Sequence, residues 1–430
     1  MKSNTISKRR FLSVAEGIGD QLCNQAFWLD SQCNWIGRSA EDIDANGSLL
    51  LSNHSLGPDL YEGTSGIGLF LSYLYKYTHN ERYYKVASGA ISHALRHVKD
   101  IPDVSRFGFY NGRIGIAYAA TQIGILNNDY TLCQSALVVL KDLIVDRRSD
   151  RHFMDVITGN AGAIPSLLSM YEVFRDEDLF EFALFLGEEL LLSAVKEPAN
   201  GLSWSSEIKG LERTRHNLTG FSHGAAGIGY GLLELFRKSG DKRFMKAADQ
   251  AFNYEDSWYS DQNNNWPDFR TDSGNRKKDT QDNLDYAITW CHGAPGIGLS
   301  RLRAYQILKD KKYLKDYMLA QKIIFKTIKD RITCNVMNNY CLCHGLFGIC
   351  EPLVLDGATH FSDKKCLQLV KKIAFEAIDR HHSNGQNPWP CGIQTGQTPG
   401  LMLGLAGIGY FCLRLYDIKK IPSILIIIPP

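Results

Sequence analysis

The chain has 430 residues, of which 44% are hydrophobic and 22% charged, as is usual for a folded protein. Its 48 Lys and Arg against 46 Asp and Glu give a net charge of +2, which argues against a nucleic-acid groove or a polybasic membrane patch. No apolar stretch reaches the roughly 18 residues of a membrane span, and no signal peptide follows the basic N-terminus. We therefore expect a cytoplasmic protein with one domain over residues 1–430, of which residues 1–10 are flexible.

Eleven cysteines are spread along the chain. Because a long chain without an export signal is expected in a reducing compartment, free thiols are favoured over disulfides. Most of the cysteines fall within apolar helical patterns and are expected to be small core residues. These are Cys23, Cys133, Cys350, Cys366 and Cys412.

A repeated motif organises most of the chain. After an amphipathic helix expected at about Phe11 to Leu29, the pattern x-G-x-x-G returns seven times, each time before a long apolar run. We call these segments the Gly loops and number them 1 to 7 in chain order. A motif that recurs in this way indicates a repeat architecture, and its glycines are expected to supply positive φ where the chain turns into each helix. The first glycines of the loops are Gly63, Gly112, Gly159, Gly224, Gly293, Gly345 and Gly404.

Each of the first six Gly loops is followed by a second amphipathic helix, and strand signals are weak. Helix pairs repeated seven times form an open solenoid or a closed ring. We predict an all-α fold, an α/α toroid of seven helix pairs. The Gly- and Ala-rich helices opened by the Gly loops suit its crowded inner layer, and the more charged helices suit its outer layer. The predicted outer helices are Tyr84 to Val98, Thr131 to Val145, Leu179 to Ala194, Lys242 to Phe252, Tyr313 to Ile328 and Lys365 to Ile378.

Two polar segments, 196–220 and 255–289, interrupt the repeat. Long irregular segments in a compact domain are often functional. We expect these two to border the mouth of a site, and plain surface insertions are an equal alternative. A nucleotide-binding interpretation of the glycines at 227–231 is disfavoured because no strand precedes them.

The Gly loops differ at the position just before the first glycine. Loops 4, 5 and 6 have His223, His292 and His344 there, whereas the other loops have unrelated residues, so packing alone does not require histidine. Cys291 and Cys343 precede the second and third of these histidines, and closure of the ring would make the two cysteines neighbours. Two thiolates and one imidazole hold Zn²⁺ with a fourth position open in catalytic sites. We predict Cys291, Cys343 and His344 as ligands, with helix-capping and core residues as the alternative.

His223 is a candidate general acid or base, because imidazole titrates near neutral pH. Asp155, just before the first glycine of loop 3, is expected to orient and polarise it, and capping of the following helix is the alternative for Asp155. His292 is left out of the ligand set. It is expected to act beside the metal or as an acid.

The residues Trp-Cys-His-Gly-Ala-Pro-Gly at 290–296 and Cys-His-Gly at 343–345, with the seven Gly loops, resemble the lanthionine synthetase C-like family. The resemblance extends from about Phe11 to Pro430. It is closest to the C-terminal cyclase domain of class II lanthipeptide synthetases. It implies an α/α toroid with a zinc ion at the end of the ring, held by Cys291, Cys343 and His344.

The resemblance also implies roles for other residues. It makes His223 and Asp155 catalytic and Trp290 an active-site residue. The position of His292 is Tyr in some free-standing cyclases. Some members have a basic residue three positions before the Trp, where this chain has Ala287.

The implied activity is zinc-dependent lanthipeptide cyclisation, in which a peptide Cys thiolate adds to dehydroalanine or dehydrobutyrine and forms a thioether. His223 or His292 would return a proton to the α-carbon. The expected substrate is a dehydrated precursor peptide with leader and core. We expect the cyclase domain to stand alone, without an N-terminal dehydratase half, and a separate dehydratase and an exporter are therefore candidate partners. Membrane association would come through such a complex.

Three alternatives stay open. The first is addition of glutathione to dehydroamino acids. The second is a carbohydrate-active α/α barrel, which would rely on paired carboxylates, whereas the Gly loops offer Cys and His. The third is a non-catalytic scaffold that keeps the ring and a structural zinc.

Overall fold

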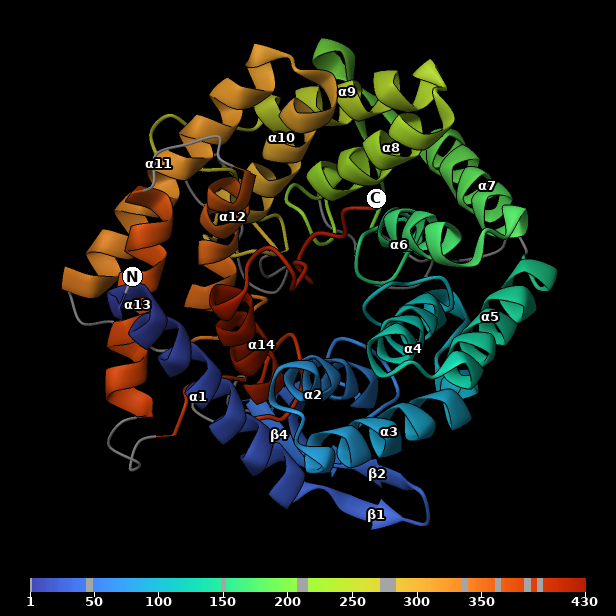
Figure 1. The fold of residues 1–430 in the computed structure, drawn as a ribbon. Coiled ribbons are helices and arrows are strands. Elements are labelled where there is room, and N and C mark those ends of the chain that lie inside the picture. The colour runs from blue at the N-terminus through green and yellow to red at the C-terminus, as the bar shows by residue number, and fades with distance from the viewer. Residues whose placement is uncertain are drawn as a thin grey trace.

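The computed structural model describes most of the chain. The described residues are 2–43, 49–147, 152–206, 216–270, 284–333, 339–359, 365–382, 388–392 and 397–430. They form a closed ring of helices in two concentric layers, so the predicted α/α toroid is confirmed (Figure 1).

The inner layer contains the helices that the Gly loops open, and their first turns are buried. They are α2 (Thr64–Thr78), α4 (Arg113–Asn127), α6 (Asn160–Phe174), α8 (Ala225–Ser239), α10 (Ala294–Leu308), α12 (Leu346–Thr359) and α14 (Leu405–Tyr416). The outer layer contains α1 (Lys2–Gln25), α3 (Glu81–Arg96), α5 (Tyr130–Val145), α7 (Glu177–Ser193), α9 (Lys242–Ser257), α11 (Lys311–Thr333) and α13 (Lys365–His381). Short 3₁₀ turns lie at Val98–Asp100, Asp103–Ser105 and Pro198–Asn200. The six predicted outer helices are all present, with bounds that differ by a few residues.

The N-terminal helix supplies the seventh outer helix, because α1 packs against α14 and so completes the last pair. The predicted bounds of this helix were wrong. It begins at Lys2, inside the part expected to be flexible, and ends at Gln25. Contacts with α13 support its first half, since Arg10 pairs with Asp379 and Phe11 stacks on Phe375 with ring centroids 4.8 Å apart.

The described residues include three short antiparallel strand pairs, which the sequence did not predict. They are β1 (Phe27–Leu29) with β2 (Gln32–Asn34), β3 (Ile36–Ile43) with β4 (Leu49–Ser55), and β5 (Val195–Glu197) with β6 (Gly201–Ser203). The residues at 27–29, predicted as the end of the first helix, form β1 instead. Trp28 there packs on Gly89 of α3, where a Cβ atom would lie 2.6 Å from the indole.

The glycines of the loops are needed for close backbone contact. In every loop, the carbonyl oxygen of the residue six positions before the second glycine lies against the Cα of that glycine. A Cβ on Gly115 would lie 1.6 Å from the Phe109 oxygen, and one on Gly227 would lie 1.9 Å from the Phe221 oxygen. The prediction of positive φ was wrong for most first glycines, since Gly63, Gly112, Gly159, Gly224 and Gly404 are extended. Gly293 has φ 83°.

A closed circle of backbone hydrogen bonds joins the seven Gly loops to one another. In six loops the donor is the N–H two positions before the first glycine, and in loop 3 it is the N–H of Val156. Each donates to a carbonyl of the next loop around the ring, over 2.7–3.4 Å. The successive pairs are Tyr61 to Tyr110, Tyr110 to Ile157, Val156 to Ser222, Ser222 to Cys291, Cys291 to Cys343, Cys343 to Met402 and Met402 to Tyr61.

The C-terminal segment, 417–430, crosses the centre of the ring (Figure 1). Its backbone carbonyls accept hydrogen bonds from inner-layer side chains, namely Tyr110 to Ile424, Trp290 to Leu425 and Tyr230 to Ile427. Its aliphatic side chains at 424–427 are buried. The segment therefore fills the space that the inner helices enclose. No described helix is long and apolar enough to cross a membrane.

Candidate functional site

Cys291 and Cys343 meet at the end of the ring where the Gly loops gather. They are 52 positions apart in sequence, and loops 5 and 6 are neighbours in the hydrogen-bonded circle. The N–H of Cys291 donates to the carbonyl of Cys343 over 3.4 Å, and the two side chains hydrogen-bond to each other. Thr289 places its Oγ1 3.2 Å from the Cys291 sulfur. Circular closure thus produces the convergence that the repeat predicted.

The two buried thiols shift each other's pKa in opposite directions. The hydrogen bond from Cys343 lowers the pKa of Cys291, and Thr289 and Arg270 act in the same direction against the effect of burial. The same hydrogen bond raises the pKa of Cys343. The hydrogen bond between the two sulfurs therefore separates their pKa values, and that of Cys291 is the lower of the two.

Tyr61 of loop 1 is a site residue that the sequence did not reveal. Its phenol hydrogen-bonds to the Cys343 sulfur, and burial raises the pKa of Tyr61, so the hydroxyl stays protonated and donates. Its position relative to the glycines of its loop could have identified it from the sequence. Tyr61, Cys291 and Cys343 all lie two positions before the first glycine of their loops, the position that faces the common centre.

His344 is on the same loop as Cys343, but its ring is engaged elsewhere. Its Nε2 lies 3.3 Å from the Nδ2 atom of Asn339, and the ring hydrogen-bonds to the carbonyl of Gly392. Burial lowers the pKa of His344, so the ring is neutral, as a metal ligand requires. Within the described ranges no three His, Cys, Asp or Glu side chains are grouped closely enough to hold an ion. Two thiols and a neutral imidazole are donor types that zinc sites use, so the chemistry of these three residues fits a zinc ion.

His223 and Asp155 form the pair that the sequence predicted. The His223 Nδ1 lies 2.7 Å from the Asp155 Oδ2, and Asp155 also accepts the backbone N–H of Thr158 over 2.7 Å. The carboxylate thus both fixes its own loop and holds the imidazole. Burial lowers the pKa of His223, but the charge of Asp155 outweighs it, so the pKa is raised overall. The His223 side chain is 29% exposed, so it is accessible to solvent.

His292 lies beside His223, with ring centroids 6.1 Å apart, in a different environment. It is 1% exposed, and its Nε2 lies 3.4 Å from the Ser222 hydroxyl. Burial lowers the pKa of His292, with the positive charge of Arg270 acting in the same direction. The ring is therefore neutral at physiological pH and packed within the site wall.

Trp290 is fully buried and is directed toward the centre of the ring. Its indole N–H donates to the carbonyl of Leu425 over 3.0 Å, and its ring packs against Tyr110 and Phe221. It therefore anchors loop 5 to the C-terminal segment. The structure gives Trp290 this packing role, and its part in catalysis stays a prediction.

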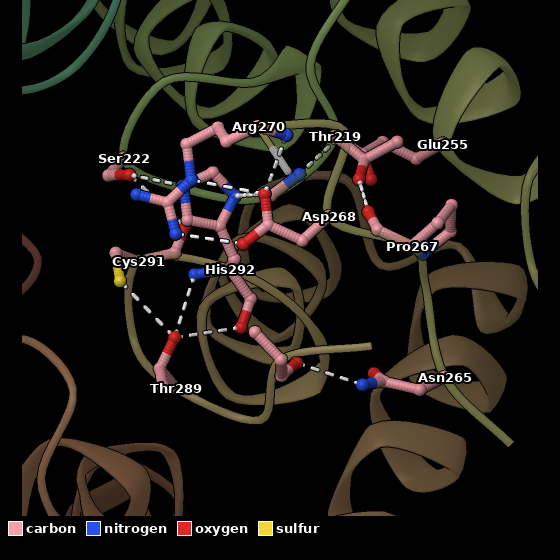
Figure 2. Close-up of polar contacts among 12 residues, drawn as sticks. Thr219, Ser222, Glu255, Asn265, Pro267, Asp268, Arg270, Thr289, Cys291 and His292 are labelled. Carbon is pink, nitrogen blue, oxygen red and sulfur yellow. Dashed lines mark hydrogen bonds and ion pairs between the residues drawn. The ribbon is translucent and has the colours of Figure 1, made fainter. Parts of the chain in front are cut away.

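A segment that follows α9 lies across loops 4 and 5 (Figure 2). Asn265 accepts the N–H of Ala294 at the start of α10 and donates to the Ala287 carbonyl, and the Thr219 hydroxyl contacts the Pro267 carbonyl. Of the segment 255–289, which was expected to border the site, residues 265–270 and 287–289 make these contacts with loops 4 and 5. In the other polar segment, 216–220 lies beside the site. Residues 207–215 and 271–283 lie outside the described residues.

The same segment contributes Asp268 and Arg270, which no motif marked. The Arg270 guanidinium forms two hydrogen bonds with the Asp268 carboxylate, over 3.0 and 2.8 Å. Its charge acts on both cysteines and on all three histidines of the site. Some members of the resembled family have a basic residue at the position of Ala287. In this chain Ala287 contributes only its backbone carbonyl, which accepts from Asn265. The positive charge beside the thiols comes from Arg270.

The chain is similar in sequence to known proteins. The chain is 26% identical over 395 residues to the lacticin 481/lactococcin biosynthesis protein LcnDR2 of Lactococcus lactis subsp. lactis, which covers 90% of this chain and 38% of that protein. It is 23% identical to the glutathione S-transferase LANCL1 of Danio rerio over 50% of this chain and 49% of that one. The chain thus spans less than half the length of these relatives.

A solved structure described as nisin cyclase has a similar fold, with a TM-score of 0.60 and 18% identity over 84% of this chain and 88% of that chain. The model of the family described as lanthionine synthetase C-like protein matches residues 54–426, which include all seven Gly loops. The chain belongs to the lanthionine synthetase C-like family.

Proposed function

We propose that the protein is a zinc-dependent lanthipeptide cyclase. In this proposal it closes thioether rings in a peptide that contains cysteines and dehydroalanine or dehydrobutyrine. One observation carries the proposal: the Cys291–Cys343 pair lies in the same loop cluster as the His223–Asp155 pair. A thiol site and a proton donor are thus within reach of one bound peptide, and adding a thiol across a carbon–carbon double bond needs both.

The donor set supports zinc as the cofactor. Cys291 and Cys343 would hold it with His344 as the third ligand, and three protein ligands leave a position for a substrate group. Bound zinc would supply a positive charge that lowers the pKa of the substrate thiol. Tyr61, which donates to the Cys343 sulfur, would hold that ligand in place.

His223 is the proton donor in this proposal. As the substrate sulfur bonds to the β-carbon, the double-bond electrons move toward the carbonyl and give an enolate. His223 then transfers its proton to the α-carbon, and the proton released by the substrate thiol balances the reaction. Asp155 keeps the imidazole oriented and protonated. His292, neutral and buried against Ser222, supports the wall of the site, and for this reason we favour His223 of the two histidines.

Addition of glutathione is the second candidate function, because a glutathione S-transferase relative covers half of the chain. The chemistry at the thiols and at His223 would be the same, and only the source of the thiol would differ. A scaffold that keeps a structural zinc is the third. A separate dehydratase, an exporter and a cytoplasmic or complex-associated location remain proposals that follow from the peptide substrate.

The test is to incubate the zinc-loaded chain with a dehydrated peptide and then trap free thiols with N-ethylmaleimide. Cyclisation leaves the peptide mass unchanged and removes its ability to take up the reagent. A parallel reaction contains glutathione and a dehydroalanine peptide without cysteine. Loss of trapping supports the cyclase, and a mass gain of one glutathione supports the second candidate. If neither product forms although zinc stays bound, the result would support the scaffold and refute the proposal.

A further inference from the structure

Arg270 lies near the site residues and has no role in the proposed transfer of sulfur and proton. Its side chain is 45% exposed, so it is accessible to solvent. Figure 2 shows it extending from the segment after α9 toward Ser222, Cys291 and His292. The charge of Arg270 acts on Cys291 and Cys343 on one side and on His223 on the other. It therefore lies close to both the candidate zinc ligands and the proton donor.

The guanidinium is fixed rather than free to swing. Asp268 is 5% exposed and binds the Arg270 side chain through two hydrogen bonds, over 3.0 and 2.8 Å. Asp268 is fixed in turn by its backbone N–H, which donates to the Asp285 carbonyl over 2.7 Å. Asn265 and Pro267 attach the same segment to loops 5 and 4. An arginine held in this way presents its remaining N–H groups in a defined direction.

The addition reaction creates a charge that such a group would stabilise. When the thiolate forms its bond to the β-carbon, the electrons of the double bond move onto the carbonyl oxygen of the dehydroamino acid residue. That oxygen stays negative until the proton from His223 reaches the α-carbon. Fixed donors aimed at a developing oxyanion are often the largest electrostatic contribution to catalysis. Cys291, Cys343 and His223 have other roles in the proposed reaction. None of them is assigned to donate a hydrogen bond to this oxygen.

We propose that Arg270 is a further catalytic residue, whose guanidinium, positioned by Asp268, donates hydrogen bonds to the enolate oxygen of the dehydroamino acid residue. This inference rests on the proposed addition of a thiol to a dehydroamino acid. It assigns to the segment after α9, which lies outside the repeated Gly loops, a direct part in the reaction. Asp268 is a positioning residue, because it acts through Arg270.

The test compares Arg270→Gln with Arg243→Gln in the full zinc-loaded chain. Arg243 is a matched control, because it pairs with the acidic side chain two positions earlier, Asp241, as Arg270 does with Asp268, and it pairs in addition with Glu188. It lies at the start of α9, about 20 Å from the Gly loops by the length of α8. Removing one donor to an oxyanion lowers kcat by about 10² to 10³-fold, so Arg270→Gln should show that loss with little change in KM. Arg243→Gln should cyclise at the wild-type rate.

Chemical rescue separates catalysis from structure. Added guanidinium ion should restore part of the kcat of Arg270→Ala. Asp268→Asn loosens the Arg270 side chain but leaves the Arg270 charge in place, so its loss of kcat should be smaller than that of Arg270→Gln. An unchanged kcat in Arg270→Gln, or a defect confined to KM, would overturn the proposal while leaving the cyclase function in place. A loss of kcat that guanidinium ion does not rescue would show that Arg270 has a structural role, and this result would overturn the proposal as well. If the wild-type chain adds no thiol, the proposed function fails and this inference fails with it.

Discussion

At the scale of single residues, the site depends on pairs of groups that change each other's charge. Cys343 lowers the pKa of Cys291 through a hydrogen bond, and Asp155 raises the pKa of His223 against the effect of burial. Each partner comes from a different Gly loop or from the residues just before one. The pKa of each of these residues therefore depends on a partner that lies far away in sequence and next to it around the ring.

Replacing Asp155 with Asn tests the second pair. A raised pKa means that the pair stabilises the fold below the unfolded-state pKa of His, near 6.5, and that this contribution is lost as the pH rises through the folded-state pKa. In Asp155→Asn the imidazole loses its proton at lower pH. The alkaline limb of the pH–rate profile should shift to lower pH, and cyclisation at neutral pH should slow about tenfold or more.

The measurement is a pH profile of kcat for both proteins, with the His223 titration followed by NMR. The oxygen that accepts the Thr158 N–H is retained in Asn, so the loop should keep its conformation. An Asp155→Asn profile that matches the wild type would show that Asp155 only fixes its loop.

At the scale of elements, the Gly loop is the unit that builds both the ring and the site. Its second glycine lets a carbonyl six positions earlier approach the start of the inner helix, and its backbone bonds the loop to the next one around the circle. Residues two positions before the first glycine then face a common centre. This register brings Tyr61, Cys291 and Cys343 together.

Gly115→Ala tests this explanation of the motif. The added Cβ would lie 1.6 Å from the Phe109 carbonyl oxygen, so the loop or the helix must move. We expect a loss of about 3 kcal/mol or more in the free energy of unfolding, the upper end for overpacking. Gly240→Asn is the control, because Gly240 has φ 74° and a Cβ added there would meet no atom within 4 Å, and Asn tolerates that conformation. Urea denaturation measures both, and equal losses would refute the explanation.

The sequence predicted the elements that repeat and missed those that do not. Seven glycine motifs with apolar runs were enough for the inner helices, the ring and the convergence of Cys291 with Cys343. The pairing of α1 with α14 was missed because it exists only once the ring closes. Asp268 and Arg270 were missed because an irregular segment carries them. The ring orientation of His344 depends on Gly392, another contact that no local pattern encodes.

At the scale of the whole molecule, the C-terminal segment and the ring depend on each other. The segment fills the centre and receives hydrogen bonds from Tyr110, Tyr230 and Trp290, which belong to three different inner units. Trp290 directly precedes Cys291. The packing at the centre of the ring therefore extends to the loop that carries a candidate zinc ligand.

Ile426→Ala should destabilise the fold by about 2–5 kcal/mol, as expected for truncation of a buried aliphatic side chain. Ile426 is 2% exposed, whereas Ile428, two positions later in the same segment, is 38% exposed. Ile428→Ala is thus a control of identical chemistry, and its loss should stay below about 1 kcal/mol. If denaturant unfolding gave the two variants the same stability, the segment would not be part of the core.

The coordination of zinc tests the central claim, that Cys291 and Cys343 share one ion and leave a position open for a substrate thiol. X-ray absorption at the zinc edge of the loaded full chain should show two sulfur ligands at about 2.3 Å. A third sulfur should appear when a cysteine-containing dehydrated peptide is added. Cys343→Ala should lose the metal, and Cys341→Ala, on the same loop, should keep it. A coordination of four protein ligands that the peptide leaves unchanged, or full zinc binding by Cys343→Ala, would contradict the claim.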